Sequence, residues 1–196
     1  SADGATLEHL QASNVEGLVA LNAPEELRRA AQSLLRARSV AFLGFRSCHS
    51  VALHAQYLHS MLIGGGFLLQ DSYGTLTEAI ATLANDAVLV AIGLAPYSRQ
   101  TVEATQRAHK QGVRIVAITD SELSPLARAA TERLLFESAS SSFFHSIVAA
   151  HALVERLMAE VAACGGRKVV MRLRAREALL RETNAYWHAG EGTPGK

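Results

Sequence analysis

The sequence predicts an α/β fold, a three-layer αβα sandwich around a five-stranded parallel sheet. Three observations lead to this prediction. Several short segments are almost continuously aliphatic, which is typical of parallel strands covered on both faces. The stretches between them carry apolar residues at helical spacing, so strands and helices alternate along the chain. With 196 residues, of which 49% are hydrophobic, the chain can bury a substantial core.

Five segments are predicted to be strands. Four of them combine continuous apolar character with β-branched or aromatic residues. The fifth, GFLLQ, is weaker and follows a break of three glycines. In chain order the predicted strands are residues 39–45, 66–70, 87–94, 113–119 and 132–138.

Helices are predicted between the strands. In residues 50–62 the apolar side chains recur at i, i+4, i+7 and i+11, which places them on one helical stripe. Short capping signals mark the other helices. These signals are Thr75 with Glu78, Ser98 before a helix over 99–111, Gly112 after that helix, and Ser124 before Pro125.

Further helices are expected before the first predicted strand and after the last one. We predict helices over 5–20 and 22–37 before it. A long helix over 141–163, apolar almost all round, is expected after it and is predicted to form part of a subunit interface. A basic helix and a loose GEGTPGK end follow. The predicted divisions are leader helices over 1–37, an α/β domain over 38–165, and a C-terminal helix and tail over 166–196. Because the opening SADGATLEH resembles a clipped fragment, we expect the natural protein to be longer at its N-terminal end.

Composition excludes several classes of function. The formal net charge is only +1, which argues against this polypeptide binding a nucleic-acid backbone by itself. Cys48 and Cys164 are far apart and lack a CxxC partner, so no disulfide framework, metal site or cofactor is expected. No stretch approaches the roughly 18 apolar residues of a membrane span, and no signal pattern opens the chain. We therefore expect a cytoplasmic protein without a membrane partner.

Small polar residues gather at three predicted strand-to-helix corners. In a parallel sheet, ligands bind beyond the carboxyl ends of the strands, where helix N-termini offer unpaired amides to anions. Hydroxyl groups and arginines add donors for a phosphate or carboxylate. The predicted binding residues are Arg46, Ser47 and His49 at the first corner, Tyr97, Ser98 and Arg99 at the second, and Ser140, Ser141 and His145 at the third.

Plainer roles exist for the same residue types. A serine before a helix is often only a cap, and a loop arginine is often only solvated. His54 and His59 flank a helical stripe and are expected to pack, and Cys48 is expected to be a small buried thiol. Glu137 is the one acid at a predicted strand end that could abstract a proton. Because a lone glutamate there is weak evidence for catalysis, no catalytic residue is assigned.

These residues resemble the sugar isomerase (SIS) domain of RpiR-type bacterial transcriptional regulators, over about residues 8–187. The resemblance rests on Asn14-Val15, on RARSVAFLGFRS, on the corner after the predicted strand 87–94, on GVRIVAITDSELSPLARAA and on the serine run at 140–142. It implies a flavodoxin-like SIS fold that dimerises and binds a phosphosugar or related anionic sugar. It also implies DNA binding through a helix-turn-helix domain that precedes the residues present here.

The chain departs from the usual SIS pattern at two corners. Arg46 stands at the second glycine of the common G-x-G-x-S, and of the common S-x-S-G-x-T only a hydroxyl remains, at Ser98. Losing donors weakens a phosphate nest, while a gained arginine supplies charge that suits a phosphate or a carboxylate. A phosphosugar effector is therefore the first expectation, with a sugar acid open. The alternatives are an aldose–ketose phosphosugar isomerase and a domain that only dimerises.

Overall fold

The computed structural model describes residues 5–187. At its centre is a five-stranded sheet in which every neighbouring pair is parallel, in the order β2-β1-β3-β4-β5. The strands are β1 (Val40–Leu43), β2 (Gly66–Leu68), β3 (Val88–Gly93), β4 (Arg114–Thr119) and β5 (Glu132–Leu135). The predicted fold class is confirmed.

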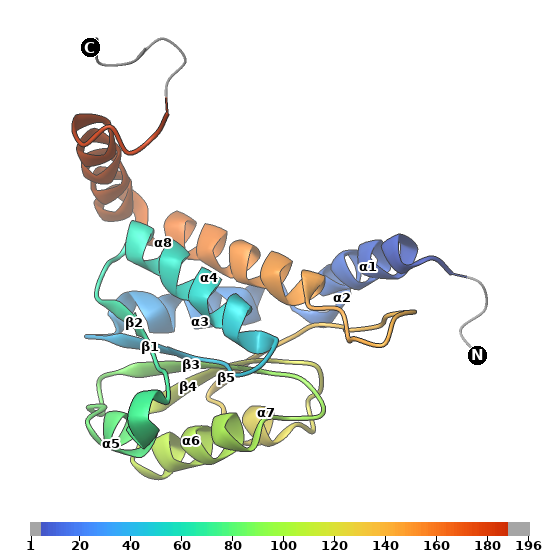
Figure 1. Cartoon of the computed structure of the whole chain (residues 1–196). Coiled ribbons are helices and arrows are strands. Elements are labelled where there is room, and N and C mark those ends of the chain that lie inside the picture. Colours follow the sequence, from blue (N-terminus) through green and yellow to red (C-terminus); the bar gives the residue numbers. More distant parts are fainter. Residues whose placement is uncertain (1–4, 188–196) are drawn as a thin grey trace, which may run out of the picture.

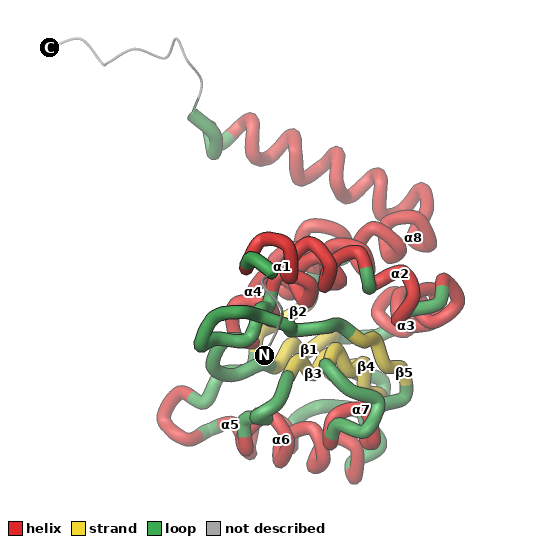
Figure 2. Tube along the Cα trace, turned by 90° about the vertical axis from the view of Figure 1, so that its right-hand side faces the viewer, coloured by secondary structure: helices red, strands yellow, loops and turns green. Residues whose placement is uncertain are grey.

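Helices cover both faces of this sheet (Figures 1 and 2). One face carries a helical layer of α3 (Pro24–Arg36), α4 (Cys48–Leu62) and α8 (Val148–Glu182), with α1 (Leu7–Glu16) and α2 (Leu18–Leu21) beside them. The other face carries α5 (Leu76–Ala81), α6 (Arg99–Lys110) and α7 (Pro125–Ala129), preceded by the short 3-10 helix Ser72–Gly74. Two apolar clusters, one on each face, form the core.

The strand order creates the site for a ligand. The chain crosses from β1 outward to β2 and then returns to place β3 on the other side of β1. Such a reversal leaves a crevice between two strands whose following helices lie on opposite faces. The carboxyl ends of β1 and β3 are therefore adjacent, and the first two polar corners of the sequence meet there.

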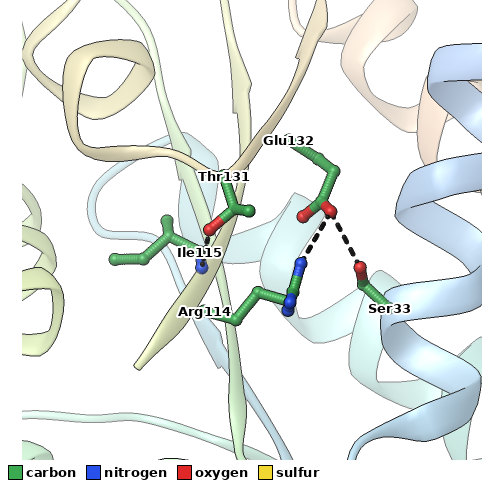
Figure 3. Close-up of polar contacts among 5 residues, drawn as sticks. All are labelled: Ser33, Arg114, Ile115, Thr131 and Glu132. Carbon is green, nitrogen blue, oxygen red and sulfur yellow. Dashed lines mark hydrogen bonds and ion pairs between the residues drawn. The ribbon is translucent and has the colours of Figure 1, made fainter. Parts of the chain in front are cut away.

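The helices before β1 are tied to the sheet rather than set apart from it. Glu132, at the start of β5, accepts hydrogen bonds through one carboxylate oxygen from Ser33 of α3 at 2.9 Å and from Arg114 of β4 at 3.1 Å, as Figure 3 shows. The buried Asn22 side chain donates to the Leu135 carbonyl at 2.7 Å and accepts from the Leu135 amide at 2.7 Å. The Asn22 side chain thus pairs with the amide and carbonyl of Leu135, which the edge strand β5 would otherwise leave unpaired.

The predicted helix over 141–163 is wrong at its start. Residues 137–147 form a loop, and α8 begins only at Val148. The Ser142 hydroxyl accepts from the Phe144 amide at 3.2 Å and donates to the Phe144 carbonyl at 3.0 Å, while Ser140 accepts from the Ser142 amide at 3.1 Å. Such local side-chain bonds compete with helical ones, which explains the late start.

At its other end α8 runs beyond the apolar segment to Glu182. It kinks at Gly166, whose φ of 54° and ψ of −140° are not helical. The basic helix predicted after the apolar one is therefore the second half of α8. The predicted loose end at 190–196 lies outside the described residues. Within residues 5–187 no helix is both long and apolar enough to cross a membrane.

The capping predictions succeed in part. Ser124 accepts from the Ala127 amide at 3.0 Å, and Gly112 ends its helix with a φ of +80°. Thr75 does not cap α5, because its hydroxyl donates backward to the Ser72 carbonyl at 2.7 Å. Ser98 precedes α6 in an extended conformation, but its side chain makes no capping hydrogen bond.

Candidate functional site

A cavity of about 430 Å³ lies at the carboxyl ends of β1 and β3. Residues from all three predicted corners line it, and four of the predicted binding residues are among them: Arg46, Ser47, Ser98 and His145. The rest of the lining is Phe45, Cys48, Ile92, Gly93, Leu94, Pro96, Thr101, Phe143 and Phe144. The other five predicted residues do not line it; they are His49, Tyr97, Arg99, Ser140 and Ser141.

The first corner presents Arg46 from a strained backbone. Its φ is +56°, a left-handed conformation that residues other than glycine adopt rarely and at a cost of about 1–2 kcal/mol. This explains why the usual pattern has glycine here. Gly44, two residues earlier, allows α4 to start directly against β1, since a Cβ there would lie 2.5 Å from the Cys48 carbonyl oxygen. The Ser47 side chain does not cap α4, so its hydroxyl is not engaged by the helix that it precedes.

Asp120, at the carboxyl end of β4, holds the second corner. Its carboxylate accepts from the Ala95 amide at 3.0 Å and from the Tyr97 hydroxyl at 2.7 Å. Burial, together with this hydrogen bond to Asp120, raises the pKa of Tyr97 to about 12. Tyr97 is thereby turned to Asp120 and orients the corner from outside the cavity. Asp120 was not predicted as a site residue, although it stands directly after a predicted strand in the ITDS segment.

Arg99 faces solvent rather than the cavity. Its side chain is 88% exposed and pairs with Glu103, one turn along α6, at 2.6 Å. Thr101, which sequence reasoning missed, lies in the first turn of the same helix and lines the cavity. Its hydroxyl oxygen is buried and has no hydrogen-bond partner among residues 5–187.

The third corner closes the cavity with aromatic rings. Ser140 and Ser142 bond to each other at 2.9 Å within the loop, and the loop places Phe143, Phe144 and His145 at the wall. The Phe rings meet edge to face at 5.2 Å and both are largely exposed. The sequence predicts these two residues as apolar positions of the helix over 141–163, whereas the structure places them in the loop before α8.

The serine loop is also tied to the N-terminal helix. The buried Asn14 of α1 donates through its side-chain amide to the Ala139 carbonyl at 2.8 Å. The loop that carries Phe143, Phe144 and His145 is therefore joined to α1 by a hydrogen bond.

The cavity is suited to an anion that also carries hydroxyl groups. Its lining residues include Arg46, which carries a guanidinium, and Ser47 and Ser98, which carry hydroxyls, and α4 and α6 begin beside it with their unpaired amides. Burial raises the pKa of the Cys48 thiol, which keeps it neutral and confirms its interpretation as a small buried side chain. Within residues 5–187 no group of three potential metal ligands is present.

The fold is a doubly wound domain with a cavity at its switch point, and comparison with known proteins gives the family. The profile of the SIS domain matches residues 33–159, so the chain belongs to the SIS domain family. An uncharacterised HTH-type transcriptional regulator of Caldanaerobacter subterraneus subsp. tengcongensis is 30% identical over 129 residues, or 66% of this chain. The match covers 45% of that regulator, so the chain spans less than half of its relative's length.

Solved structures agree with this assignment. The sugar isomerase domain of an RpiR transcription factor from Sphaerobacter thermophilus superposes with a TM-score of 0.83 at 26% identity, covering 88% of this chain and 96% of that one. The Vibrio vulnificus NanR protein complexed with ManNAc-6P superposes with a TM-score of 0.77 at 15% identity, covering 90% of this chain and 67% of that one. At that identity the second likeness concerns the fold alone. The predicted resemblance to the SIS domain of RpiR-type regulators is confirmed.

Proposed function

We propose that this chain is the effector-binding and dimerisation domain of a transcription regulator, and that it senses a phosphosugar or a related anionic sugar such as a sugar acid. DNA would be bound through a helix-turn-helix domain outside this chain, and the proposed location is the cytoplasm. One observation carries the proposal, namely that Arg46, Ser47, Ser98 and His145 converge from three separate corners on one cavity.

The chemistry of the wall supports a sugar-like anion. A single guanidinium balances one phosphate or carboxylate group, and the hydroxyls of Ser47 and Ser98 can exchange hydrogen bonds with sugar hydroxyls. The rings of Phe143 and Phe144 offer apolar surface to the C–H face of a sugar ring. The bound ManNAc-6P of NanR, on the same fold, agrees with this ligand class.

A binding role is favoured over isomerase activity. Aldose–ketose isomerisation needs a base placed at the reacting carbon. Of the candidate bases, Glu137 and His49 lie outside the cavity, and among the described residues that line it His145 is a candidate but no carboxylate is present. A second subunit could still bring a base, so proton exchange at C2 of candidate phosphosugars is the direct test of the enzyme alternative. Exchange above the buffer rate would contradict a purely sensory role.

We also propose a homodimer formed through the helical layer. Large apolar side chains are exposed there, with Leu53 and Tyr57 on α4 and Val148 at the start of α8. Both helices begin at the cavity wall, and α1 is joined to the serine loop through Asn14. An effector that binds one arrangement of these helices more tightly than another shifts the dimer, and thereby the spacing of the DNA-binding domains.

Calorimetric titration with sugar phosphates and sugar acids tests the site. Arg46→Asn removes the guanidinium but suits the left-handed backbone, since asparagine tolerates it, and Ser98→Ala removes one hydroxyl. Each is expected to weaken binding by about 5- to 150-fold, as loss of a charged or neutral hydrogen bond costs roughly 1–3 kcal/mol. Arg99→Gln is the matched control, because Arg99 lies outside the cavity, and it should bind as the parent does.

Two outcomes would overturn the assignment. Unchanged affinity in both cavity variants would remove the site. A panel in which no sugar phosphate or sugar acid raises the melting temperature would leave the domain as a dimerisation module, because a ligand of the folded state must stabilise it.

A further inference from the structure

The second half of α8, residues 167–182, projects from the domain as a basic helix, here called the C-terminal arm. Both views show the arm extending away from the sheet and its covering helices (Figures 1 and 2). It contains six basic and two acidic residues, a net charge of +4. Since the whole chain carries +1, the rest of the chain carries −3. The small overall charge therefore hides a strong separation of charge.

The cations of the arm are open to partners. All six are exposed, and the one ion pair that they form within residues 5–187 joins Arg181 to Glu177 in the arm itself. At 1.5 Å per residue the arm is about 24 Å long, which is comparable to seven base-pair steps of duplex DNA. The basic residues are Arg167, Lys168, Arg172, Arg174, Arg176 and Arg181.

The base of the arm adds to the same basic surface. A Cβ at Gly165 would lie 3.2 Å from the Leu35 side chain, so the arm leaves the domain beside the end of α3. The exposed Arg36 and Arg38 follow there, at the amino edge of the sheet. The anion cavity is at the opposite, carboxyl edge.

We propose that the C-terminal arm binds the phosphate backbone of duplex DNA. This inference rests on the proposed role as part of a transcription regulator. A row of unpaired cations on a rigid helix is complementary to closely spaced phosphates, and releasing condensed counterions drives such binding without base recognition. The arm thus adds sequence-independent affinity to whatever domain reads the operator.

The placement of the arm is compatible with this role in a dimer. In one chain, α1 and the arm lie at opposite ends of the helical layer (Figure 1). A two-fold axis lying in the plane of the exposed face of that layer, at right angles to the line from α1 to the arm, would pair the two layers and bring the arm of one copy to the end where the α1 of its partner lies. A DNA-binding domain preceding α1 in the partner would then share a duplex with the arm.

Fluorescence anisotropy with a labelled duplex of random sequence, titrated with the 196-residue chain, tests the proposal. With about four phosphate contacts, affinity should fall on the order of 100-fold between roughly 50 and 200 mM salt. Two triple variants remove the same charge from different places. The arm variant is Arg172→Gln, Arg174→Gln and Arg176→Gln. The control is Arg99→Gln, Arg107→Gln and Arg128→Gln, all exposed on the opposite face of the sheet.

The arm variant should lower the slope of log affinity against log salt by about 2–3, and the control should leave it nearly unchanged. Absence of salt-dependent binding by the parent, or equal losses in both variants, would overturn the proposal. So would an arm variant that binds DNA normally but no longer self-associates in sedimentation, since the arm would then contact a second copy of the chain. Effector calorimetry on the arm variant separates this proposal from the proposed sensing function, because the cavity is untouched.

Discussion

Acidification should destabilise this domain through His59. The ring is fully buried in α4, packs edge to face against Phe42 of β1 at 5.3 Å between centroids, and has no hydrogen-bond partner for either nitrogen among residues 5–187. Burial, and secondarily the charge of Arg172, lowers the pKa of His59 to about 4. The expectation that this histidine packs is confirmed.

The magnitude follows from proton linkage. The unfolded chain takes up a proton near pH 6.5 and the folded one only near pH 4, so stability is complete above about pH 6.5 and is lost as pH falls toward 4. Between roughly pH 7.5 and pH 5 this single group should remove about 2 kcal/mol from the free energy of unfolding.

Urea unfolding at these two pH values, for the parent and for His59→Leu at equal protein concentration, isolates the effect. The variant cannot take up this proton, while its packing change is the same at both pH values. The parent should therefore lose about 2 kcal/mol more than the variant on acidification. Equal losses in the two proteins would refute the reasoning.

Three further predictions concern stability and the second corner. Gly44→Ala should destabilise the fold by about 2–3 kcal/mol in thermal unfolding, because its Cβ meets backbone, while Gly17→Ala, at a φ of −60°, should be neutral or stabilising by about 0.5–1 kcal/mol; a reversed order would contradict the geometry. Asp120→Ala should lower the pKa of Tyr97 from about 12 toward its usual value in alkaline spectrophotometric titration, but only partly because burial remains; an unchanged pKa would exclude the contact. Asn22→Ala should cost about 2–4 kcal/mol in urea, since two backbone groups of β5 lose their partner, and a loss below about 1 kcal/mol would show that water replaces it.

The sequence alone was sufficient for the fold and for the region of the site. Runs such as 87–94 are apolar at every position, and in a segment this short and rich in β-branched residues that pattern favours a strand covered on both faces. Because parallel strands end at one edge, the polar residues after 39–45 and 87–94 had to gather there. Arg46, Ser47 and Ser98, which this reasoning predicts at that edge, all line the cavity.

Only the tertiary structure decided which side chains of each corner face the cavity. Tyr97 is turned away by Asp120, which is 23 residues distant, and the serine loop is held by Asn14, which is 125 residues distant from its partner. Within a loop a side chain follows whichever partner satisfies its polar groups, and no local periodicity records that partner. The sequence by itself determined the layers and the edge at which the site lies, while long-range hydrogen bonds chose the residues that form its wall.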